Sequence, residues 1–229
     1  MQTFDSIVIK KSVYGEADYL VTFFTREIGK VKGIARQAKK SKKRFGGRLE
    51  PFIHLKLEIT LNEGKFNVVN DVNLVRPFPS ITDSLETFAF GSFVLEHVDL
   101  FTYENEKSEE LFDATISIFN QIDRNENILP SLLKYQLTLL KFNGTLPNFE
   151  EINSKEVKFD ITNGNVYGLS ENKTGEKYHK FHLDIIKDED YMEIFLGKVS
   201  DNIKALTRYL EIQTETEFKT SKFLEELKL

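Results

Sequence analysis

The feature that most constrains the fold of this chain is a change of hydrophobic period near residue 80. Up to Val75, apolar and polar residues alternate, and β-branched and aromatic types are frequent, which is the pattern of half-buried strands. Turn signals such as Gly15 and Asn62-Glu63-Gly64 divide this part into short segments. The predicted strands are 4–14, 18–25, 30–35, 51–62 and 66–75. Five short strands in succession fit a small closed β-barrel.

Beyond residue 79, apolar residues recur at helical spacing. Ser80-Ile81-Thr82-Asp83 looks like a capping box and predicts the start of a first helix that runs to about Val98. Further helices are predicted after Ser108, at 128–143 and at 195–210. The helix at 128–143 is apolar almost all round, so we expect it in the centre of a helical bundle.

Residues 145–182 lose helical periodicity and contain three of the twelve glycines of the chain. We expect a loop-rich insertion here, with a short hairpin that turns at Asn163-Gly164. The predicted fold class is therefore α+β. A five-stranded barrel domain at 1–79 is followed by an all-α helical domain at 80–229 that carries the cysteine-free insertion at 145–182.

The charge of the chain divides in the same way as its period. The formal net charge is −5, but residues 1–80 hold 15 basic and 8 acidic residues, and the rest of the chain is strongly acidic. Residues 30–48, KVKGIARQAKKSKKRFGGR, contain no acid. Their nine cations are Lys30, Lys32, Arg36, Lys39, Lys40, Lys42, Lys43, Arg44 and Arg48.

A block of one charge sign repels itself and predicts an oppositely charged partner. For DNA, these nine cations would contact phosphates, and Phe45 between them could stack on a base. The other rings in the barrel segment are Tyr14, Tyr19, Phe23 and Phe24, of which about half should face the core. The alternatives are a solvated basic loop, and a loop neutralised by the acidic helical part of the same chain.

Four stretches of the barrel segment carry a family resemblance. Tyr14–Val21, Phe24–Val31, Ala35-Arg36 with the basic run, and Phe45–Phe52 resemble the opening of the bacterial recombination mediator family RecO. Tyr209–Glu211 and Lys219–Leu227 resemble the close of that family, and the match between the two ends is thin. The resemblance implies that the barrel is an OB-fold.

The resemblance also implies a function and partners. Members of the family bind single- and double-stranded DNA, anneal complementary strands, and act with RecR to help RecA onto DNA coated by the single-strand-binding protein SSB. The acidic SSB tail needs a hydrophobic groove with a few cations. Arg124, Lys134 and Lys141, near the third predicted helix, are the nearest fit to such a groove.

The insertion departs from the family pattern. Many family members carry a four-cysteine zinc motif here, whereas this chain has no cysteine. We predict no zinc, and we expect His179 and His182 at the surface. The apolar residues expected to hold the insertion together are Phe149, Ile152, Val157, Phe159, Ile161, Val166, Tyr167 and Leu169.

No enzyme signature is found. Gly46-Gly47 lacks the spacing and the following Lys-Ser or Lys-Thr of a nucleotide-binding loop, and Gly91-Ser92-Phe93 lacks the second glycine of a nucleophile elbow. We therefore predict a non-enzymatic protein without a cofactor. With no apolar leader, membrane span or cysteine, a cytoplasmic, nucleoid-associated location is expected. An adaptor whose basic loop docks on an acidic protein is the alternative, and a metal-dependent nuclease is a distant third.

Overall fold

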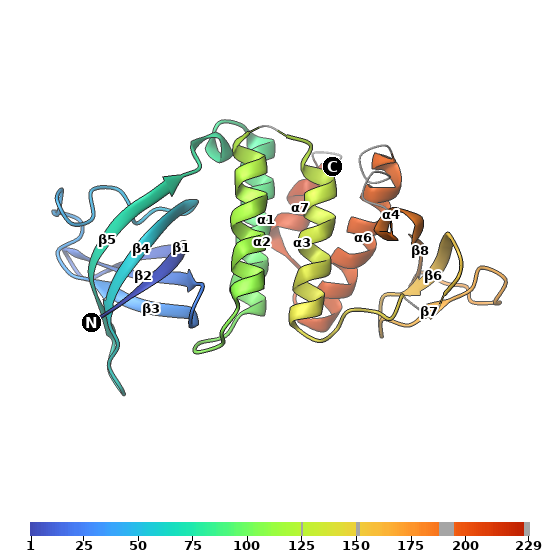
Figure 1. Ribbon diagram of the computed structural model, residues 1–229, viewed down its shortest axis with the longest axis horizontal. Coiled ribbons are helices and arrows are strands. Elements are labelled where there is room, and N and C mark those ends of the chain that lie inside the picture. Colours follow the sequence, from blue (N-terminus) through green and yellow to red (C-terminus); the bar gives the residue numbers. More distant parts are fainter. Residues whose placement is uncertain (125, 150–151, 188–194, 227–229) are drawn as a thin grey trace. The chain divides into compact units, whose positions relative to one another are not determined.

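The first part of the chain is a five-stranded barrel, as the alternating pattern predicts (Figure 1). The computed structural model describes residues 1–124, 126–149, 152–187 and 195–226. The barrel strands are β1 (Gln2–Tyr14), β2 (Asp18–Thr25), β3 (Gly29–Ala35), β4 (Ile53–Thr60) and β5 (Asn67–Pro77). Their order is β1-β2-β3-β5-β4, and β4 pairs with β1 to close the barrel. This order, with a parallel β3–β5 pair, is that of an OB-like fold.

The barrel interior is filled by the inward-facing half of each strand. Val21 and Phe23 on β2, and Leu55 and Leu57 on β4, lie two residues apart and are fully buried, as a period of two requires. Side chains from all five strands join one apolar cluster in the centre. Tight closure over this cluster fixes the outer face of the barrel and the loops at its ends.

Two helices, α1 (Leu85–Phe101) and α2 (Glu109–Asp123), follow the barrel (Figure 1). The expected helix start at Ser80 is wrong, because Pro79–Thr82 forms a short 3-10 turn. The capping box lies four residues later, where the Ser84 side chain accepts a hydrogen bond from the Thr87 backbone N–H and the Thr87 hydroxyl accepts one from the Ser84 N–H.

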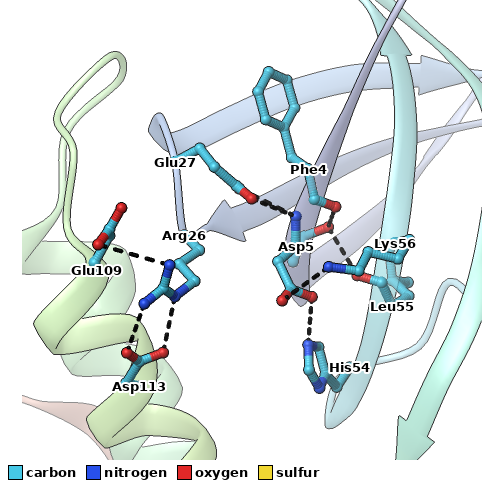
Figure 2. A network of polar contacts seen from close by, with 10 residues as sticks. Phe4, Asp5, Arg26, Glu27, His54, Leu55, Lys56, Glu109 and Asp113 are labelled. Carbon is cyan, nitrogen blue, oxygen red and sulfur yellow. Dashed lines mark hydrogen bonds and ion pairs between the residues drawn. The ribbon is translucent and has the colours of Figure 1, made fainter.

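A hydrogen-bonded ion pair joins the barrel to α2 (Figure 2). Arg26, in the turn between β2 and β3, donates from Nε and Nη2 to the two carboxylate oxygens of Asp113, each at 3.0 Å. Glu109 lies 3.6 Å from its Nη1. The hydrogen bond to Asp113 is the main cause that raises the pKa of Arg26, so the guanidinium stays charged. Two parallel hydrogen bonds fix direction as well as distance, which orients the helix against the turn.

Gly29 shows how closely the loop after α1 packs on the barrel. Its φ of 67° is left-handed, and a Cβ there would lie 2.3 Å from the carbonyl oxygen of Glu106. Lys30 donates its backbone N–H to the carbonyl of Tyr103 beside it. Only glycine fits this contact, which ties the start of β3 to the loop between α1 and α2.

The remainder of the chain combines helices with a small sheet. Its elements are α3 (Ile128–Phe142), β6 (Glu156–Asp160), β7 (Val166–Tyr167), β8 (Tyr178–His182), α4 (Asp184–Lys187), α6 (Leu196–Gln213) and α7 (Lys219–Glu226). The strand order is β7-β6-β8. Helix α3 packs on α6, where the Gln136 amide donates to the Thr207 hydroxyl inside the interface. This part is helical as expected, but it is not all-α.

The insertion at 145–182 contains the expected hairpin and a third strand that periodicity did not reveal. β6 and β7 pair across the turn at Asn163-Gly164, and β8 adds to the other edge of β6. Phe149 stacks on Phe181 with ring centroids 4.9 Å apart, and Phe159 packs beside them. Leu169 is 47% exposed, so its expected place in this cluster is wrong. β8 was missed because its sequence, YHKFH, is short and largely polar.

Contacts between residues divide the chain into two compact units, 1–123 and 124–229. Helices α1 and α2 therefore belong with the barrel in space, although the change from strand to helix falls near residue 80. A domain boundary at 79/80 stays a prediction from sequence. No helix in the described ranges is long and apolar enough to cross a membrane.

Candidate nucleic-acid interface

Most of the basic segment lies in the loop between β3 and β4, which is pinned to one end of the barrel, while Lys30 and Lys32 are on β3 itself. Three apolar side chains of the loop, Ala38, Phe45 and Leu49, are buried and belong to the central cluster of the barrel. Backbone hydrogen bonds fold it further, including Lys39 N–H to Ala17 O and Arg48 N–H to Phe45 O. A segment rich in like charges is thus given a defined shape by apolar anchors spaced along it.

Three of the cations help to fold this loop. Lys39 Nζ donates to the carbonyl oxygens of Gly15 and Glu16 at 3.0 Å each. Arg44 donates to the carbonyl of Arg36. Arg48 donates to two further main-chain carbonyls, those of Val72 and Lys43. Carbonyl partners leave the positive charge uncancelled, so these side chains shape the loop and still contribute to its potential.

Lys30 has a structural role, and its expected place among the phosphate-binding residues is wrong. Its side chain is only 15% exposed and pairs with Asp99 of α1, whose carboxylate lies 3.2 Å from Nζ. Lys10 binds the same carboxylate at 3.0 Å. Burial alone would raise the pKa of Asp99, but the two lysines outweigh it and lower that pKa. The Lys30 ammonium is therefore held in an ion-pair cluster within the chain.

Seven cations of the segment are exposed. Two of them, Lys39 and Arg44, donate to main-chain carbonyls of the loop, and in the described part of the chain no carboxylate forms an ion pair with the other five. They are Lys32, Arg36, Lys40, Lys42 and Lys43. Acids that flank the segment in sequence are engaged elsewhere: Glu27 accepts the Asp5 backbone N–H, and Glu50 pairs with Lys11. Asp18 accepts the Gln37 backbone N–H at 2.8 Å. These five side chains remain available to an external anion.

Phe45 cannot serve as the stacking ring that its position between cations suggests. The ring is 1% exposed within the barrel cluster, and the Arg44 guanidinium covers it with its carbon 4.9 Å from the ring centroid. Phe23 and Phe24 are fully buried as well, whereas Tyr14 is 41% exposed. The sequence predicts an accessible ring because charged residues flank it. A buried apolar anchor in a charged loop has the same local sequence pattern.

A second aromatic, Phe66, was missed by sequence reasoning. It lies in the turn between β4 and β5 and is 54% exposed. Its ring contacts the Tyr14 ring edge to face, with centroids 5.7 Å apart. The two rings line a surface hollow, which we call the Tyr14 hollow. Its other main lining residues are Ile34, Arg36, Lys65 and Val68. The signal available in the sequence was Lys65-Phe66, a cation and a ring directly after a turn.

A second hollow lies on the other side of the β1–β2 hairpin. Tyr14 pairs with Asp18 across the hairpin, and Val13 pairs with Tyr19, so Tyr14 and Tyr19 point to opposite faces of the ribbon. Tyr19 lines a hollow formed with Lys39, Lys40 and Lys42 of the basic loop. The barrel therefore offers one surface on each side of this hairpin, one rich in loop lysines and one with exposed rings.

The three cations expected to contact a protein partner lie in the second compact unit. Lys134 and Lys141 are exposed on α3 and seven residues apart, which places them on one face of the helix. Arg124 precedes α3, and its Nη1 lies 3.6 Å from Glu126. The structure brings two of the three onto one helix face, and a partner role for them stays a prediction.

The two histidines of the insertion do not converge, and the expected surface position of His182 is wrong. Both lie on β8, three residues apart, so their side chains point to opposite faces of the strand. His182 is 3% exposed, with Nδ1 3.2 Å from Glu156 and Nε2 3.5 Å from Asp201. Among the described residues, no three histidine or acidic side chains are placed to hold a metal ion.

Two models of one protein family match consecutive parts of the chain, up to residue 176. The family model for the N terminal of Recombination protein O matches residues 1–78, and that for its C terminal matches 82–176. The DNA repair protein RecO of Myxococcus xanthus is 34% identical over 146 residues, which cover 64% of this chain and 60% of the relative.

Two further relatives carry the same name. The DNA repair protein RecO of Geobacter sulfurreducens is 33% identical over 59% of each chain. That of Thermoanaerobacter sp. is 26% identical over 240 residues, 97% of this chain and 96% of the relative. The match thus spans about three fifths of the first two relatives and nearly the whole of the third.

Proposed function

Since this chain belongs to the RecO family of DNA repair and recombination proteins, we propose that it binds single- and double-stranded DNA through the basic loop of its barrel. In this proposal it anneals complementary strands. With RecR it helps RecA onto DNA coated by SSB, without an enzymatic step of its own. The family resemblance of the sequence is confirmed by the comparisons, and the DNA and partner steps are the proposal.

One observation supports DNA binding above the others. Lys32, Arg36, Lys40, Lys42 and Lys43 are exposed, while the loop that carries four of them is held by buried side chains. Each phosphate that such a cation neutralises releases condensed counterions, which favours binding without any base contact. Because the loop is already shaped, less conformational entropy is lost when the complex forms.

Strand annealing follows from the same cations. Two complementary strands repel each other through their phosphates, and a protein that neutralises part of that charge lowers the repulsion. Holding both strands close also raises their effective concentration, so pairing needs neither nucleotide hydrolysis nor a covalent step. The two hollows, one on each side of the β1–β2 hairpin, provide surface for more than one strand.

The partner contacts in this proposal use the second compact unit. The SSB tail is acidic and ends in apolar residues, and the cations on one face of α3, Lys134 and Lys141, suit its acidic part. An adaptor that uses the basic loop for an acidic protein instead of DNA would need the same exposed lysines. Binding and annealing assays separate these two functions.

The test compares Lys42/Lys43→Glu with a control of equal charge change, Lys155/Lys204→Glu, at exposed lysines of the second unit. We expect the loop variant to bind a labelled oligonucleotide about tenfold more weakly or worse, and the control to bind like wild type. Annealing of a fluorophore-labelled strand to a quencher-labelled complement should slow in parallel. An unchanged spontaneous annealing rate with wild-type protein would favour the adaptor, and equal affinity of the two variants would contradict the DNA-binding role of the loop.

A further inference from the structure

Two aromatic rings are exposed on the barrel and lie outside its apolar core cluster. Tyr14 and Phe66 are 41% and 54% exposed, and they meet edge to face at an interplanar angle of 61°. In that arrangement the edge of one ring meets a face of the other, so this contact leaves a face of each ring uncovered. Paired exposed rings of this kind are typical of binding surfaces.

Both rings are held in place by neighbouring main-chain contacts. Tyr14 is the last residue of β1 and pairs with Asp18. The carbonyl of Phe66 accepts the Asn62 side-chain amide at 3.1 Å, and the next residue, Asn67, donates to the carbonyl of Lys32 at 2.8 Å. The turn that carries Phe66 is thus fixed to β3, and little order has to be gained when a ligand stacks on the rings.

The charges around the rings suit a phosphate chain. Arg36 and Lys65 line the Tyr14 hollow, and both are exposed. The one acid that lines it, Asp18, has a carboxylate oxygen engaged by the Gln37 N–H. Ile34 and Val68, paired on neighbouring strands, add apolar lining to the same hollow. A flat apolar group linked to an anion matches this surface.

We infer that Tyr14 and Phe66 form a base-stacking subsite for unpaired DNA, distinct from the loop lysines that bind phosphates. The inference rests on the proposed DNA-binding function. It adds that this surface selects unpaired over paired DNA. Bases in a duplex are stacked on each other and hide their faces, whereas bases in a single strand offer them. The ring surface therefore binds a single strand, and the lysine loop binds either form.

The experiment separates bases from phosphates. Affinity is measured for labelled oligo(dT), for an oligomer of the same length with abasic sites, and for a blunt duplex. The proteins are wild type, Tyr14→Leu, Phe66→Leu and the control Tyr103→Leu, which removes an exposed ring that lines neither hollow. A 2-aminopurine base in the single strand reports stacking directly, because its fluorescence falls when it stacks.

We expect wild type and Tyr103→Leu to prefer oligo(dT) over the abasic strand by about fivefold or more. Each of the other two variants should reduce that preference and the 2-aminopurine quenching, with duplex affinity unchanged. If these two variants lost affinity equally for all three ligands, or kept the wild-type preference for oligo(dT), the inference would be overturned. The proposed function would stand in either case. Failure of wild type to bind any of the three ligands at low salt would refute the proposed function, and the inference with it.

Discussion

Mutation of Phe45 tests which role this side chain has in the basic loop. A buried anchor and a stacking ring respond differently to the same substitution. The side chain is 1% exposed and packs in the barrel cluster with Ala38 and Leu49 from the same loop. Replacing a fully buried phenylalanine by alanine costs about 3–5 kcal/mol. Loss of the stacked Arg44 guanidinium adds about 0.5–1 kcal/mol. Because whole domains are stable by only about 5–15 kcal/mol, Phe45→Ala should bring the barrel close to unfolding.

Urea denaturation followed by circular dichroism measures this cost, since the chain has no tryptophan for fluorescence. A loss of about 4 kcal/mol moves the midpoint of unfolding down by about 2 M urea. Phe45→Leu keeps most of the apolar volume but has no aromatic ring. It should recover most of the stability and bind DNA like wild type. A Phe45→Leu protein of normal stability that has lost single-strand affinity would refute the anchor role and restore the stacking role.

Three further predictions concern side chains away from the proposed interface. Lys30→Gln leaves the partly buried carboxylate of Asp99 with one lysine, so urea unfolding should show a loss of about 1–2 kcal/mol while DNA affinity stays the same. Burial lowers the pKa of His97 to about 3, so this histidine is neutral in the fold and takes up a proton on unfolding below its ordinary pKa of 6.5. Stability should therefore fall by up to about 1.4 kcal/mol per pH unit as the pH drops from 6.5 to 5, and His97→Leu should flatten this slope in pH-dependent denaturation. Arg26→Lys keeps the charge but loses the two parallel hydrogen bonds to Asp113, so Tm should fall in calorimetry. Asp113→Asn should lower Tm too. The Tm of the Arg26→Lys/Asp113→Asn double variant should be no lower than that of the less stable single variant.

Much of the barrel could be predicted because its residues obey one local rule. Alternation and turn residues located all five strands within a few residues of their observed ends. The first turn of α1 was misplaced because Ser80 and Ser84 both precede apolar runs, and Pro79 favours a tight 3-10 turn at the first of them. β8 escaped because edge pairing with β6, a tertiary contact, makes its polar sequence a strand.

The site was predictable in composition but not in the role of each side chain. A count of cations cannot show that Lys30 meets Asp99, a residue 69 positions away, or that Arg48 turns inward to the carbonyl of Val72. The pairing of Tyr14 with Phe66 depends on barrel closure, which brings the turn after β4 beside the end of β1. Local sequence patterns predict the charge of the surface. The tertiary structure of the closed barrel is needed to tell which side chains are anchors, which form structural ion pairs and which are exposed.

The central claim is that exposed cations of the basic segment, on β3 and in the loop after it, bind DNA through its phosphates. The most direct test is the affinity of wild type for a labelled single strand, measured by fluorescence anisotropy over a range of salt concentrations. If Lys32, Arg36, Lys40, Lys42 and Lys43 each neutralise one phosphate, log K should fall with log salt at a slope of about −3.5, and Lys42/Lys43→Gln should reduce that slope by about 1.4. An affinity that hardly depends on salt, or a slope that the two substitutions leave unchanged, would contradict the claim.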